Sequence, residues 1–477
     1  MRRFLLSLVL LGGSLPLATA QSEFRQGDLY IASDALPAPG GGSIRGLLRV
    51  DTFSGATQQI ATLASTPLAA AYDSWRQRLV VAATAPGLPT TTTLLLFDAA
   101  GTISTIPSTT GTTWKIVAPA GDGRIYLAPS TLGSTLRVVN ASGILVPVVN
   151  FAGTGTIPMS TAESAHYDPQ TQSLFVLSTS GSTACSPGGT YGVVRKIPLD
   201  AAGTHQSAPE TSVSLCVGTG GAATATFDPE EITHGPSGFL YLTLDDNTNN
   251  TVERAIVLDP VTLNYAAYAV VGGYTGASSC DAGAYSTLLD KVVILDTLNN
   301  RLRIFEPGTT GPGTLFSTGV SAGGGFAEVT HLVEIGGPLA GVSGFGFGTP
   351  GCAGPQLLAM SMTPKVGTPD LRYLCSNAPP SSLGLAIVGN AEDVLGSDPL
   401  FLGVIFHVDL LASTHFEFLD MVSSPQGVGQ TPFAIPLIPA SVGTVFVAQA
   451  LWAWIGCSTG SPFGLSTSSG LTAVIQM

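Results

Sequence analysis

Short apolar strands recur along the first two thirds of the chain, and each one after the first is preceded by another strand and a polar turn. They open at Leu29, Leu79, Ile125, Leu174, Leu240 and Val292, at intervals of roughly 50 residues. Polar and apolar residues alternate within them and in the strands that follow. Such alternation predicts β-structure, because successive side chains of a strand point to opposite faces. Each interval has room for four strands, the content of one blade of a β-propeller.

The repeat predicts six blades that close into a ring. The first unit lacks the inner strand that precedes the apolar strand of each later unit. The segment Phe326–Glu334 (FAEVTHLVE) resembles such an inner strand and is followed by no second strand of its own. We therefore expect it to pair with Leu29–Ser33 and complete the first blade, which removes an open sheet edge. The 58 Gly and 33 Pro residues interrupt almost every candidate helical window, so the predicted fold is all-β.

The repeat pattern and the composition change after Gly336-Gly337-Pro338, which predicts a domain boundary there. The repeat ends there, and the rest of the chain is richer in Pro and in short apolar strands. We predict a β-propeller over 21–337 and a β-sandwich over 338–477. Trp452 and Trp454 alternate within one strand of the second region. Packing in the sandwich core is the favoured role for them, and an exposed aromatic platform for sugars is the alternative.

Residues 1–20 have the pattern of a secretory signal peptide. Arg2 and Arg3 precede the apolar stretch Phe4–Leu11, and Ala18-Thr19-Ala20 forms an A-x-A cleavage site. This stretch and all later apolar segments are shorter than the ~20 residues needed to span a bilayer. The chain is therefore expected to be secreted or held at the cell envelope. Its six cysteines then predict disulfide bonds, with Cys185 and Cys216 as the candidate pair in the longest blade.

The charge of the chain restricts its partners. Only 10% of the residues are charged, and the formal net charge is −13. Binding to a nucleic-acid backbone needs clustered Lys and Arg, so nucleic acid is not expected as a partner. An acidic chain remains suited to binding cations, and a propeller commonly binds a protein, a glycan or another small molecule at its channel mouth.

Two segments resemble known families. The stretch Val292–Gly308 (VVILDTLNNRLRIFEPG) looks like an NHL repeat, in which an apolar strand and Asp precede an Asn-Asn-Arg turn; Asp296, Asn299, Asn300 and Arg301 carry the match. NHL-type propellers bind proteins, nucleic acids or small molecules, so this resemblance implies a fold rather than an activity. The segments Gly344–Pro355 and Ser376–Gly389 resemble a C-terminal β domain of secreted planctomycete-like bacterial proteins, which implies a module for surface retention or assembly.

Three predicted inner strands share the spelling Glu-x-x-His. Residues three apart on a strand point to opposite faces, so we expect either the acids or the imidazoles, and not both, to face the channel. Four carboxylates near one mouth would repel one another unless a hard cation such as Ca²⁺ neutralised them. The acid set is Glu163, Glu231, Asp281 and Glu328, and the alternative histidine set is His166, His234 and His331.

The acid set is similar to the divalent-ion sites of senescence-marker and gluconolactonase-like propellers, although acids here replace that family's Asn ligands. The resemblance implies a cation-dependent lactonase or esterase. One G-x-S-x-G spelling occurs, at Gly319–Gly323, but no helix signal supplies the strand-turn-helix setting that a serine-hydrolase elbow needs. The favoured hypothesis is a non-catalytic propeller that binds a ligand or protein at its channel. For the acid and histidine sets, the alternative to a site is that they only satisfy hydrogen bonds between blades. A structural component of the cell envelope is a further hypothesis.

Overall fold

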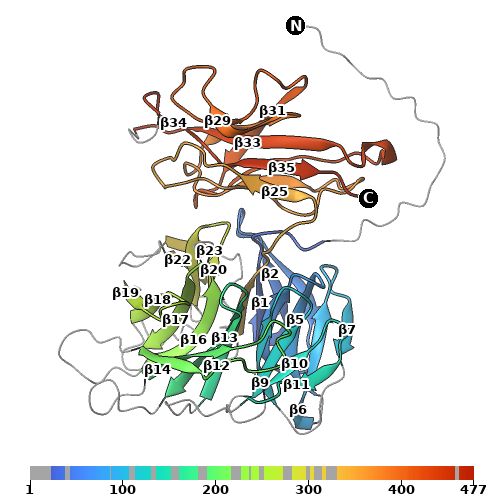
Figure 1. Cartoon of the computed structure of the whole chain (residues 1–477), viewed down its shortest axis with the longest axis vertical. Coiled ribbons are helices and arrows are strands. Elements are labelled where there is room, and N and C mark those ends of the chain that lie inside the picture. The colour runs from blue at the N-terminus through green and yellow to red at the C-terminus, as the bar shows by residue number, and fades with distance from the viewer. Residues whose placement is uncertain are drawn as a thin grey trace.

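The computed structural model describes residues 23–37, 43–85, 88–106, 113–129, 136–151, 161–180, 191–215, 227–235, 238–246, 252–271, 282–296, 301–305, 314–317, 330–456 and 461–477. These residues form an all-β molecule with two lobes (Figure 1). The described helical structure is one 3-10 turn, Pro439–Ser441. It is far too short to cross a bilayer, and no longer helix occurs in the described ranges.

The lower lobe in Figure 1 is a six-bladed β-propeller, as the repeat predicts. Every blade is a four-stranded antiparallel sheet, and in each one the strand nearest the propeller axis lies at the sheet edge. From the axis outward, blade 1 is β24 (Thr330–Glu334), β1 (Leu29–Pro37), β2 (Ser43–Val50) and β3 (Thr57–Thr62), and blade 2 is β4 (Pro67–Asp73), β5 (Arg78–Ala85), β6 (Leu88–Phe97) and β7 (Ile103–Ile106). Blade 3 is β8 (Trp114–Pro119), β9 (Ile125–Pro129), β10 (Arg137–Val139) and β11 (Leu145–Pro147), and blade 4 is β12 (Thr161–Asp168), β13 (Ser173–Ser180), β14 (Tyr191–Pro198) and β15 (Thr211–Leu215). Blade 5 is β16 (Phe227–His234), β17 (Leu240–Asp246), β18 (Val252–Leu258) and β19 (Tyr265–Val271), and blade 6 is β20 (Gly283–Ser286), β21 (Lys291–Asp296), β22 (Arg301–Phe305) and β23 (Thr314–Ser317).

The predicted closure of the ring is confirmed. Strand β24 pairs with β1 in antiparallel register, with Leu29 opposite Glu334 and Ser33 opposite Thr330. The first blade is thus built from both ends of the propeller region. This pairing leaves no open edge between blades 1 and 6, and unfolding of either end must break it.

Aspartates fix the turns that follow the inner strands. Asp73 accepts hydrogen bonds from the backbone N–H groups of Trp75 at 3.1 Å and Arg76 at 3.4 Å. Asp168 does the same for Gln170 and Thr171 in the next such turn. A buried carboxylate that satisfies two backbone donors holds the chain in an Asx turn, so the repeated Tyr-Asp spelling encodes the turn that starts the next strand.

The upper lobe is the C-terminal β domain. Eight strands of one antiparallel sheet follow the order β25-β35-β33-β28-β31-β32-β27-β26, and β34 pairs with β33. Its two end strands contact each other, so the sheet curls almost closed around a core that contains the fully buried Trp452. A separate hairpin of β29 and β30 packs on its outside. The strands are β25 (Val342–Phe345), β26 (Leu358–Met360), β27 (Arg372–Cys375), β28 (Leu383–Gly389), β29 (Glu392–Ser397), β30 (Phe406–Val408), β31 (Phe416–Ser423), β32 (Gly429–Pro432), β33 (Val445–Ala453), β34 (Leu465–Thr467) and β35 (Gly470–Val474).

The two tryptophans of β33 and its continuation take different places. Trp452 packs in the core, as favoured from the sequence. Trp454 is half-buried, and its indole N–H donates to the Ser466 hydroxyl at 2.7 Å. Neither ring therefore lies free as a flat aromatic platform for sugars.

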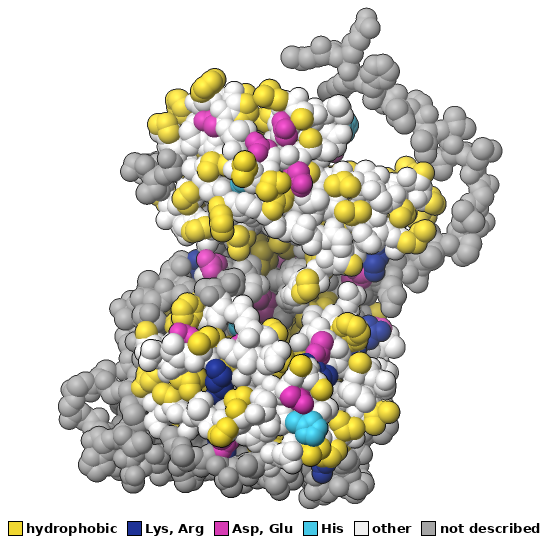
Figure 2. Space-filling model, viewed as in Figure 1, with side chains coloured by type: hydrophobic (Ala, Val, Ile, Leu, Met, Phe, Trp, Pro, Cys, Tyr) yellow, Lys and Arg dark blue, Asp and Glu magenta, His cyan; other side chains and the backbone are white. Residues whose placement is uncertain are grey.

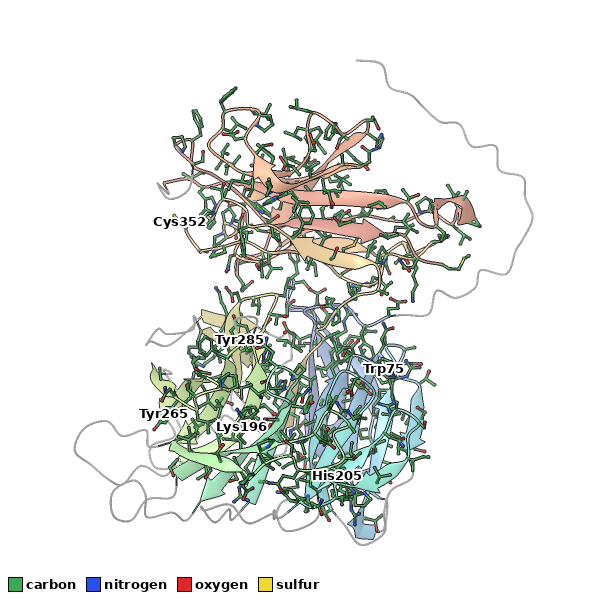
Figure 3. All side chains as sticks on the ribbon, viewed as in Figure 1. Trp75, Lys196, His205, Tyr265, Tyr285 and Cys352 are labelled. Atoms are coloured by element: carbon green, nitrogen blue, oxygen red, sulfur yellow. The ribbon has the colours of Figure 1, made fainter. Side chains whose placement is uncertain are left out.

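The C-terminal domain packs across the seam at which the propeller closes. Leu374 and Val428 of this domain join one hydrophobic cluster with residues of blades 1 and 6. Beside it, the Asn377 amide donates to the Asp290 carboxylate at 3.1 Å, and the Asp290 carboxylate also accepts from the Tyr285 hydroxyl. Figure 3 labels Tyr285 at the side of the propeller nearest the C-terminal domain. The two lobes therefore share a packed, hydrogen-bonded interface.

Candidate functional site

The propeller axis holds a cavity of about 480 Å³. Residues from all six inner strands line it, together with residues of the turns after β4, β8, β12 and β20 and the segment Gly336–Pro338. Because every inner strand is a sheet edge, its unpaired backbone side faces the axis. The cavity is thus the described part of the central channel, at the mouth beside the C-terminal domain.

Small side chains on the inner strands keep the channel open on one side. Ala70 and Ala71 of β4 and Val117 and Ala118 of β8 line the cavity from blades 2 and 3. Leu332 and Val333 of β24 continue this apolar surface. We call these six residues the apolar wall. An alanine at these positions leaves the volume that a larger side chain would fill, so the wall offers contact area without a polar partner.

Polar side chains face the apolar wall from blades 4 and 5. His166 of β12 and His234 of β16 lie side by side, with ring centroids 5.5 Å apart and the rings only 15° from parallel. Burial lowers the pKa of His166 to about 4, and the neighbouring His234 contributes to that decrease. Burial also lowers the pKa of His234. Both imidazoles are therefore neutral at pH 7, and each has a ring nitrogen able to accept a hydrogen bond.

Glu231 is the acidic group of this polar wall. The Ser164 hydroxyl donates to its Oε1 at 2.5 Å, and the same Ser164 oxygen accepts the backbone N–H of Ile232 at 3.3 Å. Glu231 Oε2 lies 3.8 Å from Nδ1 of His331 on β24. Blade 6 lies between blades 5 and 1, so this contact reaches across the channel. Ser164 thereby holds Glu231 in a fixed orientation toward the axis. We call His166, Glu231, Thr233 and His234 the polar wall.

The strand pairing corrects the alignment that the Glu-x-x-His spelling suggests. Register shifts in β12 and β16 mark β-bulges at Glu163 and Glu230. Ser164 and Glu231 each follow a bulge, so Glu163 corresponds in space to Glu230 and not to Glu231. Similar shifts occur at the same place in β4 and β8. A bulge adds one residue without a partner, which a comparison by spelling cannot detect.

The three histidines likewise occupy different levels of the channel. His234 pairs with the first residue of its neighbouring strand, Leu240. His166 lies one residue deeper in its own blade, and His331 lies three residues deeper, opposite Ala32. The expectation of one histidine ring in a single register is therefore wrong.

The expectation that only one kind of side chain can face the channel is also wrong, since both Glu231 and His234 line the cavity. The reason lies in how a blade is oriented. Its inner strand turns an edge, and not a face, to the axis, so side chains from either face can bend toward the channel.

Glu334 lines the cavity but has a structural role. Its carboxylate accepts from the Ser286 hydroxyl at 2.6 Å, from the Thr287 N–H and hydroxyl at 2.8 and 2.9 Å, and from the Leu288 N–H at 3.3 Å. Glu334 belongs to blade 1, and these donors belong to the end of the inner strand of blade 6 and the turn that follows it. It therefore joins the two blades at the closure seam.

Several predicted residues lie outside the described ranges: Asp281, Glu328, Cys185, Cys216, Asn299 and Asn300. Asp296 and Arg301 pair across the hairpin of blade 6, as the strand-turn-strand pattern predicts. Within the described ranges, no three His, Cys, Asp or Glu side chains are placed to hold a metal ion. Of the four residues predicted to bind Ca²⁺, only Glu163 and Glu231 lie in the described ranges, and they do not occupy equivalent positions in their blades. The Ca²⁺ site stays a prediction. Cys375 is a buried free thiol.

Sequence reasoning missed Ser164 and the alanines of the apolar wall. A signal for them is present in the sequence: the spellings AAAYD at 69–73, ESAHYD at 163–168 and GAYS at 283–286 place small residues one to three positions before a Tyr near the end of an inner strand. A row of small residues on edge strands around an axis is the pattern that leaves a channel open.

Fold and cavity define a class: a six-bladed β-propeller with an axial cavity and an appended C-terminal β domain. No family model and no curated protein matches the chain. Among solved structures, TolB from Acinetobacter baumannii aligns over 66% of this chain and 68% of its own, with 13% identity and a TM-score of 0.40. A gluconolactonase from Xanthomonas campestris aligns over 62% of this chain and 91% of its own, with 11% identity and a TM-score of 0.35. Likeness at this level says nothing about the activity of this chain.

Proposed function

We propose that this protein is a secreted or cell-envelope propeller that binds a small ligand in its axial cavity and carries out no reaction there. The observation that carries the proposal is the pairing of two unlike walls around one space. The apolar wall offers alkyl surface, and the polar wall offers a fixed carboxylate and two neutral imidazoles. A volume of about 480 Å³ is in the range of pockets that enclose small molecules.

Blocking the cavity tests the proposal. Ala71→Phe places a ring in the space between the walls, because Ala71 lines the cavity on β4. Ala100→Phe is the matched control, since Ala100 is exposed in the β6–β7 turn of the same blade. Hexan-1-ol serves as a neutral amphipathic probe, and saturation-transfer NMR reports its binding. We expect the wild type and Ala100→Phe to bind hexan-1-ol and Ala71→Phe to lose most of the signal. Equal signals from all three proteins would refute the cavity as the binding site.

The second candidate function is cation-dependent hydrolysis of a lactone or ester, with Glu163, Glu231, Asp281 and Glu328 as the acid set. The carboxylate of Glu231 beside the channel favours keeping it. Metal analysis of the purified protein and melting curves with and without a chelator separate the two functions. Binding alone predicts no bound ion and an unchanged melting temperature. A stoichiometric ion whose removal lowers the melting temperature would support the hydrolase.

We further propose that residues 1–20 direct export, that 21–337 and 338–477 are the two domains, and that the second is a module for surface retention or assembly. Support for the module comes from large apolar side chains that it exposes, among them Leu395 at 93% and Phe401 at 86%. Figure 2 shows hydrophobic side chains spread over the visible face of the upper lobe. Such exposure is characteristic of interaction surfaces. Fractionation of cells that express the full chain and a Leu395→Ser/Phe401→Ser variant tests this. Retention of both proteins in the envelope fraction would contradict a role for these side chains.

A further inference from the structure

We propose that the natural ligand of the axial cavity is a small molecule with a cationic ammonium group and an apolar body. This inference rests on the proposed function and specifies the ligand class. The ammonium group would bind Glu231, and the apolar body would lie along the apolar wall toward the channel mouth.

The first argument is the charge of the cavity. Its described lining contains two acidic residues, Glu231 and Glu334, and neither Lys nor Arg. Lys115 of β8 lies on the bulge of that strand and is not part of the lining. Because the two lining histidines are neutral at pH 7, no positive side chain of the described lining offsets these carboxylates. A negative cavity with low-dielectric walls attracts cations and repels anions.

The second argument is the unused capacity of Glu231. Its Oε1 accepts the Ser164 hydroxyl. Its Oε2 lies 3.8 Å from His331 Nδ1, beyond hydrogen-bonding distance. Within the described part of the chain no donor bonds to that oxygen. A carboxylate oxygen held in place and left without a donor is the acceptor that an ammonium group requires.

The other carboxylate of the lining is not available in this way. Glu334 already accepts four hydrogen bonds from Ser286, Thr287 and Leu288. Its lone pairs are taken up by the turn of blade 6. Glu231 is therefore the acid of the lining that a ligand can use, which places the cationic group on the side of blade 5.

The third argument is additional acceptor capacity on the polar wall. Nε2 of His234 is buried and has no hydrogen-bond partner in the described ranges. The unprotonated nitrogen of a neutral imidazole can accept a hydrogen bond from a ligand N–H or O–H group, so a buried ring nitrogen without a partner is costly until a ligand supplies that bond. Nε2 of His234 thus offers the ligand an uncharged acceptor beside the stacked rings of His166 and His234, in addition to the carboxylate of Glu231.

The length of the cavity suggests the size of the ligand body. Glu231 lies three residues deeper along β16 than His234, which is at the channel mouth. At ~3.3 Å per strand residue this separation is about 10 Å, comparable to a six-carbon chain. Across the cavity, Ala71 and Ala118 lie one residue below the mouth level, and Ala70 and Val117 lie two residues below it. A ligand bound at Glu231 can therefore keep its alkyl part in contact with the apolar wall.

Three probes that differ only in their head group test the inference. Isothermal titration calorimetry at pH 7 measures hexylamine, hexan-1-ol and hexanoate against the full-length protein. A charge-assisted hydrogen bond in a partly enclosed site predicts that hexylamine binds at least about tenfold more tightly than hexan-1-ol. Hexanoate should bind more weakly than both. Hexan-1-ol or hexanoate equal to or tighter than hexylamine would overturn the inference.

Variants assign the effect to Glu231. Glu231→Gln should weaken hexylamine binding at least about tenfold and leave hexan-1-ol within about twofold. Glu417→Gln makes the same change on an exposed residue of β31 in the C-terminal domain and should change neither affinity. An unchanged hexylamine affinity in Glu231→Gln would overturn the assignment. The comparison of the three probes on the wild type needs no variant, so the inference stays testable if Glu231→Gln does not fold.

Failure of this inference and failure of the proposed function give different results. If the cavity binds no small molecule, all three probes fail to bind, and Ala71→Phe changes nothing. If it binds small molecules of another class, hexan-1-ol or hexanoate binds the wild type at least as well as hexylamine, and Ala71→Phe abolishes that binding.

Discussion

Glu334 offers a quantitative test of how the ring is closed. In Glu334→Ala the Ser286 and Thr287 hydroxyls can turn to other partners, but the backbone N–H groups of Thr287 and Leu288 lose their acceptor. An unsatisfied buried donor costs about 1–3 kcal/mol. Two such donors would cost about 2–6 kcal/mol. Glu334 lines the cavity, so channel water can reach part of this site, and burial already raises the pKa of the carboxyl group. Both effects reduce the cost, and we expect a loss of about 2–3 kcal/mol.

Urea unfolding and limited proteolysis measure this loss. Glu334→Ala should unfold at lower urea than the wild type, and its first cleavages should fall in blades 1 and 6, which lose a tie at the seam. Glu334→Gln is the control, because its amide oxygen still accepts from the turn and should restore part of the stability. A Glu334→Ala protein within about 0.5 kcal/mol of the wild type would refute the reasoning, since surface substitutions alone produce changes of that size.

Three further predictions concern the channel, the core and the interface. Burial lowers the pKa of His166 from an unfolded value near 6.5 to about 4. The neutral His166 side chain therefore contributes its full share to the free energy of unfolding above pH 6.5, and this share is lost as the pH falls toward 4. In the wild type this loss of stability amounts to up to about 3 kcal/mol. The fall in the urea midpoint between pH 7 and pH 4.5 should therefore be smaller in His166→Gln than in the wild type. An equal fall in both proteins would contradict the prediction. Trp452→Ala removes a fully buried ring and should lower the stability of the C-terminal domain by about 3–5 kcal/mol. Calorimetry should show this domain melting at a lower temperature. An unchanged melting profile would place Trp452 outside a packed core. Asn377→Ala removes the hydrogen bond to Asp290 and should speed proteolysis in 335–341 without altering far-ultraviolet circular dichroism; cleavage at the wild-type rate would mean that the bond does not hold the domains together.

Much of the fold could be predicted from the sequence because its determinants are local. The Tyr-Asp turns and the apolar strands that follow them repeat often enough to give the blade count. The closure by 326–334 follows from a missing strand at one end and a surplus strand at the other, and β24 pairs with β1 as expected. Alternation of polar and apolar residues also identified the C-terminal region as β-structure and Trp452 as a core residue.

The site was less predictable because its determinants are not local. The bulges at Glu163 and Glu230 change the register by one residue and leave no mark in the polar pattern. The contact between Glu231 and His331 joins residues 100 positions apart, and only the closed ring brings their strands together. Ser164 matters only because the pairing of blades 4 and 5 places its hydroxyl on Glu231. No pattern along the chain encodes that contact.

A crystal structure of the full-length protein grown with hexan-1-ol tests the axial cavity as the binding site most directly. The account predicts density for the probe between Ala118 and His166, with its alkyl chain on the apolar wall and its hydroxyl toward the polar wall. A cavity filled with water alone at a saturating concentration of hexan-1-ol, with the probe bound only elsewhere, would contradict the account.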